Sequence, residues 1–281
     1  MSQDKSINIK FDTFVNFIKD YDLNIDYYLD IGAGDGKLSK KIHEYLKIQN
    51  KDCNLVMIDP YTNIDTEHDQ IHIKNISELN LHDDIKKYSF GLITAFSAFH
   101  HVNNFEQTLE YIERYCTRDC FLFFKDHDIQ DPILQVIEDI VHLKDIVKFG
   151  EYEGYNDFLK NYYTSFFAKD SFHNTLIWMG FKNLLITQET GIRFQYYSLY
   201  QFKDAHLKYI VLPSFSNSIY NYNNNNISEI FYSLKKVLSN NKEYKKLYFD
   251  RNINIFKFID KNSNIKDQNI IIKKLVNFIR K

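Results

Sequence analysis

Four ionisable residues follow one of the most apolar segments of the chain. Phe121–Phe124 is continuously hydrophobic, and Lys125, Asp126, His127 and Asp128 come directly after it. A lysine can lower the pKa of a nearby hydroxyl, and a histidine can remove its proton as a general base. The alternative is that His127 and Asp128 only orient one another at the end of a strand.

A ligand-binding corner is indicated nearer the N-terminus. The apolar run Tyr27–Ile31 contains Asp30 and predicts a buried strand, and a helix is expected over about residues 37–48. Three glycines lie between them at alternate positions: Gly32, Gly34 and Gly36. They allow a sharp turn and let a ligand lie against the backbone. The unpaired N–H groups of the following helix favour a nucleotide-type ligand.

The spacing of this loop excludes two common nucleotide motifs. Lys37 stands where the dinucleotide fingerprint needs its third glycine, and Gly36-Lys37-Leu38 fails the phosphate-loop pattern. The segment resembles motif I of the class I S-adenosylmethionine-dependent methyltransferases. This resemblance implies that S-adenosylmethionine lies over Gly32, Ala33 and Gly34.

A second acid stands at the end of the next predicted strand, which covers Asn54–Ile58. Asp59 is followed by Pro60, which cannot donate to a strand ladder. A carboxylate can accept from both hydroxyls of a ribose, so Asp59 and Pro60 are assigned to the cofactor ribose. The alternative is a solvated aspartate at a strand end.

The resemblance implies further contacts with the cofactor. Asn75 and Ile76 stand at the end of the predicted strand Gln70–Ile76 and correspond to the residues near adenine, although an acid is more usual than Asn75. The amino-acid end of the cofactor is expected near Asp30 and the backbone of Ala95 and Phe96.

The resemblance to class I methyltransferases also indicates candidate catalytic residues. A histidine pair such as His100-His101 is frequent in small-molecule methyltransferases of this family, so His100 joins Lys125, Asp126 and His127 as a catalytic candidate. RNA ribose 2′-O-methyltransferases also have a lysine at the end of an apolar strand, but this chain lacks their acid after the fourth strand. Residues 125–128 also resemble a signature of methyltransferase-like proteins from large DNA viruses.

The candidate site residues follow different predicted strands, so they can meet only if the carboxyl ends of these strands lie at the same edge of one sheet. Apolar runs alternate with helical patterns, which predicts a parallel sheet covered by helices on both faces. Together with the resemblance, this predicts a doubly wound, mostly parallel seven-stranded sheet of the class I methyltransferase type, with a C-terminal helical appendage. Ligands of such sheets bind at the carboxyl ends of the strands. The expected strands are residues 27–31, 54–58, 70–76, 90–96, 121–128, 184–187 and 194–202, the last two forming an antiparallel hairpin.

Helices are predicted from apolar residues at helical spacing. The first covers residues 1–21 and lies either over the cofactor cleft or on the edge of the sheet. Others cover residues 104–115 and Ile133–Phe149. The methyltransferase domain is expected to span residues 1–205.

The composition changes after this domain. An Asn-rich linker is predicted over residues 206–226 and a basic helical tail over residues 227–281. Residues 235–281 hold 13 Lys/Arg and four Asp/Glu, a balance of +9 that leaves −11 for residues 1–234 of a chain of net charge −2. This asymmetry favours an anionic partner such as RNA, and a solvated lysine-rich helical face is the alternative.

The remaining features favour a cytoplasmic protein, in the host cytoplasm if the source is viral. The three cysteines form neither a disulfide framework nor a metal pattern, so no metal ligand is assigned. Charges interrupt the N-terminal residues, so neither a signal peptide nor a membrane span is expected. The oligomeric state is left open.

Three functions remain open. The first is a methyltransferase that acts on RNA with the tail as a docking arm. The second is a methyltransferase for a small molecule or a protein, and the third is a non-catalytic partner subunit with this fold. The intact set of Asp30, the glycine loop and Asp59 argues against the third.

Overall fold

The computed structural model describes most of the N-terminal half of the chain and parts of the rest. The described residues are 3–129 except 24, 50–51, 83–84 and 86–88, together with 138, 142, 163–188, 195–203, 215–217, 270 and 274. In this part of the chain, no helix is long and apolar enough to cross a membrane.

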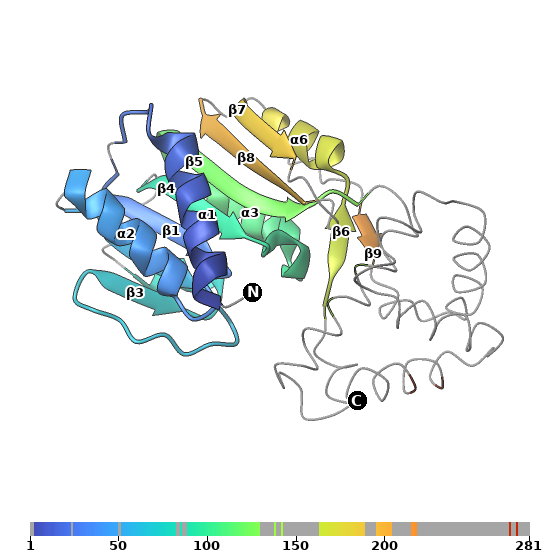
Figure 1. Cartoon of the computed structure of the whole chain (residues 1–281), viewed down its shortest axis with the longest axis horizontal. Coiled ribbons are helices and arrows are strands. Elements are labelled where there is room, and N and C mark those ends of the chain that lie inside the picture. The colour runs from blue at the N-terminus through green and yellow to red at the C-terminus, as the bar shows by residue number, and fades with distance from the viewer. Residues whose placement is uncertain are drawn as a thin grey trace. The chain divides into compact units, whose positions relative to one another are not determined.

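Seven strands form one sheet, as predicted (Figure 1). Their order is β3-β2-β1-β4-β5-β8-β7, in which β3, β2, β1, β4 and β5 pair in parallel and β8 is antiparallel to both β5 and β7. The order reverses direction at β1, so the corner between β1 and β4 is the expected ligand position. The bounds are β1 Tyr27–Ile31, β2 Asn54–Ile58, β3 Gln70–Ile73, β4 Phe90–Phe96, β5 Cys116–His127, β7 Phe181–Gln188 and β8 Gln195–Phe202.

Helices cover both faces of this sheet (Figure 1). The helices are α1 Gln3–Ile18, α2 Lys37–Gln49, α3 Phe105–Tyr115 and α6 Lys169–Trp178, with short 3-10 helices η1 Ile76–Leu81 and η2 Phe99–His101. Adjacent residues of a strand point to opposite faces. Accordingly Phe123 contacts Phe14 of α1 at 5.4 Å between ring centroids, whereas Phe124 contacts Phe172 of α6 at 5.1 Å.

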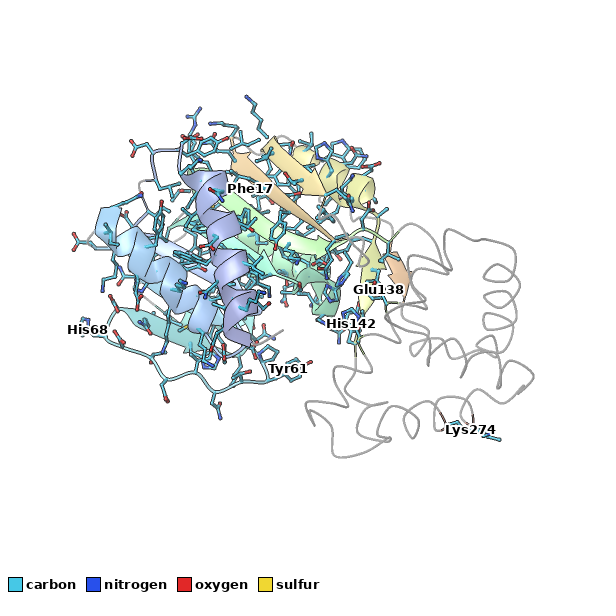
Figure 2. All side chains as sticks on the ribbon, in the orientation of Figure 1. Phe17, Tyr61, His68, Glu138, His142 and Lys274 are labelled. Atoms are coloured by element: carbon cyan, nitrogen blue, oxygen red, sulfur yellow. The ribbon has the colours of Figure 1, made fainter. Side chains whose placement is uncertain are left out.

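The first helix packs over central strands of the sheet. Phe17 of α1 contacts Phe123 of β5 and Tyr197 of β8, with ring centroids 5.2 and 6.3 Å apart (Figure 2). The alternative of a helix on the edge of the sheet is therefore wrong, because the edge strands are β3 and β7.

Three predicted strand boundaries differ clearly from the structure. β3 ends at Ile73 instead of Ile76, because Asn75 caps η1, and β7 begins at Phe181 instead of Leu184. The largest difference is in β5, which begins at Cys116 instead of Phe121. The pairing of β5 with β4 is irregular between Phe90 and Leu92, and Asp119 has a φ of 74°. Such a bulge interrupts the alternation of buried and exposed residues, which hides the start of the strand from a pattern search.

The chain divides into two compact units. The first comprises residues 1–128, 169–189 and 195–214, and the second comprises residues 129–168, 190–194 and 215–281. Within the second unit, β6 (Ser165–Phe167) pairs with β9 (Phe215–Asn217) in antiparallel fashion. β9 lies in the segment predicted as a linker. The predicted boundaries at 205 and 226, most of the helix Ile133–Phe149 and nearly all of the basic tail lie outside the described residues and stay predictions.

Candidate active site

The three loop glycines differ in what surrounds them. A Cβ on Gly32 would lie 2.5 Å from Cβ of Ala98, and one on Gly36 would lie 2.8 Å from Cγ2 of Ile64. Close packing within the protein therefore excludes side chains at both positions. A Cβ on Gly34, whose φ is 58°, would have no atom of the described residues within 4 Å. The open face of the loop is thus at Gly34, where a ligand can lie against the backbone.

The carboxylate of Asp59 joins this loop to the end of β2. Its Oδ2 accepts from the N–H of Gly34 at 2.8 Å, and its Oδ1 accepts from the N–H groups of Tyr61 and Thr62 at 3.0 and 2.8 Å. A carboxylate has about four acceptor positions, so about one remains for a ligand hydroxyl. The assignment of Asp59 to a ribose fits this geometry, whereas acceptance from both hydroxyls stays a prediction. Pro60 follows directly and ends β2.

Asp30 is buried behind the glycine loop within a hydrogen-bonded network. Its two oxygens accept from the hydroxyls of Ser39 and Thr94, and the hydroxyl of Tyr28 lies 2.8 Å from that of Thr94. Since Thr94 donates to Asp30, Tyr28 donates to Thr94. Burial raises the pKa of Asp30 to about 6, although the hydrogen bonds from Ser39 and Thr94 and the charge of Lys10 lower it. Asp30 is therefore an internal support of the corner.

The other predicted cofactor residues lie at the same edge of the sheet. Asn75 caps η1, because its side-chain oxygen accepts from the N–H of Ser77 at 3.0 Å, and Ile76 beside it is buried. Ala95 and Phe96 are buried at the end of β4. Contact between these residues and adenine or the amino-acid end of a cofactor stays a prediction.

The catalytic candidates His100 and Asp126 form a direct pair. Nδ1 of His100 lies 2.7 Å from Oδ1 of Asp126, and both side chains are 1% exposed. The chain reaches this position through Ser97, whose φ of 60° is rare for a residue with a side chain. Burial alone would raise the pKa of Asp126, but the charges of and hydrogen bonds from His100 and His127 hold it well below its usual range. The carboxylate is therefore ionised and accepts the Nδ1 proton of His100. In the neutral form of the imidazole, this contact makes Nε2 the basic nitrogen.

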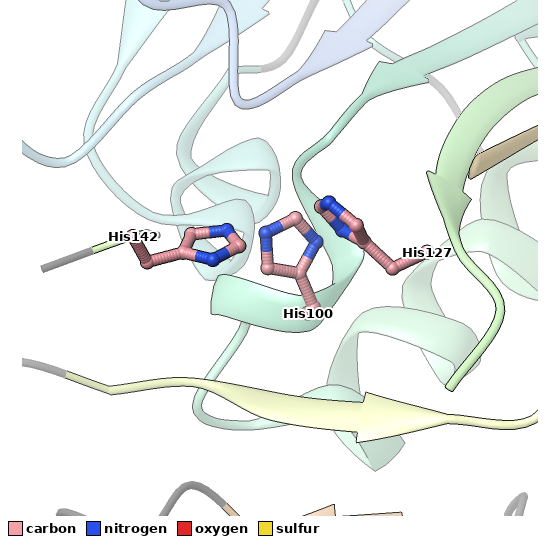
Figure 3. Close-up of side chains that lie close together, drawn as sticks. All are labelled: His100, His127 and His142. Atoms are coloured by element: carbon pink, nitrogen blue, oxygen red, sulfur yellow. The ribbon is translucent and has the colours of Figure 1, made fainter. Parts of the chain in front are cut away.

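His127 lies beside this pair in a different hydrogen-bonding role. Its ring meets that of His100 edge-on, with centroids 4.6 Å apart (Figure 3). Nε2 of His127 lies 2.8 Å from the side-chain amide nitrogen of Gln195. An amide nitrogen only donates, so Nε2 of His127 is an acceptor and is already occupied. This geometry favours His100 over His127 as the base.

The other two residues of the Lys125–Asp128 segment point elsewhere. The Nζ of Lys125 lies 5.0 Å from the centroid of the Tyr197 ring, on the face covered by α1. Asp128 accepts from the N–H of Lys169 at 2.9 Å and so caps the first turn of α6. Capping of α6 is a structural role for Asp128, and the alternative that His127 and Asp128 only orient one another stays a prediction.

Sequence reasoning missed several residues of this site. Thr94 stands opposite Asp30 in the parallel pairing of β1 and β4, and Gln195 stands opposite His127 in the antiparallel pairing of β5 and β8. Both could have been found once the strand register was assumed. Lys10 of α1 gave no signal of its own, because its position depends on how the helix packs.

The part of the chain that holds the glycine loop is similar to a known protein family. Residues 29–122 match a family model described as a methyltransferase domain. No curated protein matches the chain significantly. The matches give no support to the viral resemblance.

Several solved structures are similar to the chain at low sequence identity. The CurJ carbon methyltransferase is 15% identical with a TM-score of 0.44, and the alignment covers 70% of this chain but only 54% of the CurJ chain. A putative S-adenosylmethionine-dependent methyltransferase from Listeria monocytogenes is 9% identical with a TM-score of 0.47, over 71% of this chain and 99% of the other. A further one from Mesorhizobium loti is 10% identical with a TM-score of 0.44, over 66% and 95%.

The glycine corner, the strand order and the family match agree with one another. The matched segment begins in β1 and ends in β5, so it contains the glycine loop, Asp59 and the strand reversal between β1 and β4. Residues 29–122 are therefore similar to a methyltransferase domain, and the sheet that contains them has the predicted mostly parallel, seven-stranded topology.

Proposed function

We propose that the protein is an S-adenosylmethionine-dependent methyltransferase in which the His100–Asp126 pair deprotonates the acceptor. The observation that carries the proposal is the presence of two sites at one edge of the sheet. One is the open face of Gly34 tied to Asp59, and the other is the 2.7 Å contact between His100 and Asp126.

The cofactor corner fits S-adenosylmethionine by its free space and by the acceptor position that remains on Asp59. The open face of Gly34 and this acceptor suit a nucleoside, with Asn75 and Ile76 near the base. When bound, S-adenosylmethionine supplies an electrophilic methyl group on a sulfonium. Methyl transfer needs mainly orientation of donor and acceptor, and the loop between β1 and α2 is held for this by its hydrogen bonds to Ile58 and Asp59.

His100 supplies the proton transfer in this proposal. Asp126 holds the imidazole in one tautomer and stabilises the imidazolium that forms when Nε2 takes a proton. This arrangement suits an acceptor with a removable proton, such as a hydroxyl, an amine or an acidic C–H group. His127 and Gln195 support the pair by fixing the position of Asp126, whose Oδ1 also accepts from the N–H of His127 at 2.7 Å.

A methyl-incorporation screen tests this function. The wild-type chain, His100→Gln and His101→Gln are incubated with labelled S-adenosylmethionine and panels of small molecules, proteins and RNAs. We expect an acceptor that is labelled by the wild type and His101→Gln and at least about a hundredfold more slowly by His100→Gln. Equal labelling by all three would contradict the role of His100. Cofactor binding without transfer to any acceptor would favour the non-catalytic alternative.

RNA is a second candidate acceptor because of the charge asymmetry between residues 235–281 and the rest of the chain. Binding through lysines to phosphates weakens steeply with salt. The test compares RNA affinity of the full-length wild type with that of a variant in which lysines of the tail are replaced by Gln: Lys235, Lys236, Lys245 and Lys246. A similar affinity in both proteins at low salt would contradict the docking role and favour a small-molecule acceptor.

A further inference from the structure

The first helix brings a cation to the carboxyl edge of the sheet. Nζ of Lys10 lies 5.8 Å from the ring centroid of Phe96, the last residue of β4. The helix is anchored on both sides of Lys10. Asn8 accepts a hydrogen bond of 2.6 Å from Nζ of Lys41 in α2, and Phe14 packs on Phe123 of β5. The position of Lys10 therefore follows from the docking of the whole helix.

The corner that Lys10 approaches is rich in negative charge. Asp30 and Asp59 are both buried there, and each raises the electrostatic cost of a further anion. The charge of Lys10 acts in the opposite direction, since it lowers the pKa of Asp30 against the effect of burial. Lys10 is thus close enough to Asp30 to influence charges at the end of β1.

The proposed cofactor carries an anion that needs such a cation. The amino-acid end of S-adenosylmethionine has a carboxylate as well as an amine. The resemblance of the glycine loop to motif I implies that this end lies near Asp30, Ala95 and Phe96. A carboxylate beside Asp30 requires a neutralising partner, and a charged hydrogen bond is stronger than a neutral one. Lys125 lies on the same face of the sheet, but its Nζ lies over Tyr197 of β8, on the side of β5 away from β1.

We infer that Lys10 of α1 binds the carboxylate at the amino-acid end of S-adenosylmethionine and so selects the complete cofactor over analogues that lack this group. This inference rests on the proposed function. It assigns a binding role to a helix outside residues 29–122, the segment matched by the family model.

Binding calorimetry with two ligands tests the inference directly. S-adenosylmethionine and its decarboxylated analogue differ only in the carboxylate. They are titrated into the full-length wild type, Lys10→Met, Lys10→Arg and the control Lys41→Met, which removes another lysine that contacts α1. We expect Lys10→Met to weaken S-adenosylmethionine binding by roughly ten- to a hundredfold and to leave the affinity for the analogue within about twofold. Lys10→Arg should retain most of the preference.

Each other outcome has a distinct meaning. Equal weakening of both ligands by Lys10→Met, or by Lys41→Met as well, would overturn the inference, because the effect would then come from the packing of α1. Unchanged binding of both ligands to Lys10→Met would also overturn it. If the wild type binds neither ligand, the proposed function itself fails and the inference fails with it.

Discussion

The N–H group of Gly34 donates a hydrogen bond of 2.8 Å to the carboxylate of Asp59. This bond joins the glycine loop after β1 to the end of β2. Two more backbone N–H groups, those of Tyr61 and Thr62, donate to the same carboxylate. Asp59 therefore has a structural role in shaping the corner in addition to any contact with a ribose.

Replacement of Asp59 by Ala should affect both stability and cofactor binding. Three backbone N–H groups would lose their acceptor, so we expect a loss of about 1–3 kcal/mol in the free energy of unfolding. Chemical denaturation measures this loss, and calorimetry should show S-adenosylmethionine affinity reduced by at least about tenfold. Wild-type cofactor affinity in Asp59→Ala would contradict the assignment.

Gly34→Ala and Gly32→Ala form a matched pair with opposite expected defects. Gly34 has an open face, so its replacement should cost about 1 kcal/mol of stability for the positive φ while a methyl group fills the ligand position. Gly32→Ala would bring a Cβ within 2.5 Å of that of Ala98, and we expect a much larger loss of stability. Thermal unfolding and calorimetry on both variants distinguish the two. A Gly34→Ala protein with unchanged cofactor affinity would show that the ligand does not use this face.

Substitutions of His100 or Asp126 should impair catalysis without weakening ligand binding. Once an acceptor is known, His100→Gln or Asp126→Asn should lower kcat by about 10²–10⁴-fold, because the base is removed or loses its fixed tautomer. S-adenosylhomocysteine affinity should stay within a few fold of the wild type. Similar losses in kcat and in ligand affinity would instead indicate a structural role for the pair.

Asp30 predicts a specific pH dependence of stability. Its pKa in the folded state is raised from 3.8 to about 6, mainly by burial, so the folded state holds this proton more tightly than the unfolded state. The stabilising contribution of protonated Asp30 is complete below about pH 4 and is lost as the pH rises through about 6.

The side chain of Asn does not ionise in this pH range, so the Asp30→Asn variant is the reference for the pH dependence of the wild type. The free energy of unfolding of the wild type relative to that of Asp30→Asn should fall by about 3 kcal/mol between pH 4 and pH 6 and then stay constant. Denaturation at several pH values measures the difference. A difference between the two proteins that does not vary with pH would mean that Asp30 titrates normally.

The sequence predicted the strands and the position of the glycine loop well because both depend on local patterns. β1 and β4 have the predicted bounds, since continuous apolar runs mark strands buried on both faces. The start of β5 was missed because a bulge places polar residues within the strand. β6 and β9 have three residues each, which is too short for a recognisable pattern.

The chemistry of the site depended more on tertiary contacts. His100 and Asp126 were both candidates, but only the structure pairs them and shows that Gln195 occupies His127. Lys10 is brought to Phe96 by the docking of α1 against aromatic residues of β5 and β8. The angle of such packing follows from many side chains at once, so no motif in the sequence records it.

Isothermal calorimetry of the full-length chain tests the central claim most directly. S-adenosylmethionine, S-adenosylhomocysteine and a nicotinamide dinucleotide are titrated separately into the wild type and into Gly34→Ala. We expect one site for each S-adenosyl ligand, much weaker binding to Gly34→Ala and no binding of the dinucleotide. Binding of the dinucleotide without binding of either S-adenosyl ligand would contradict it.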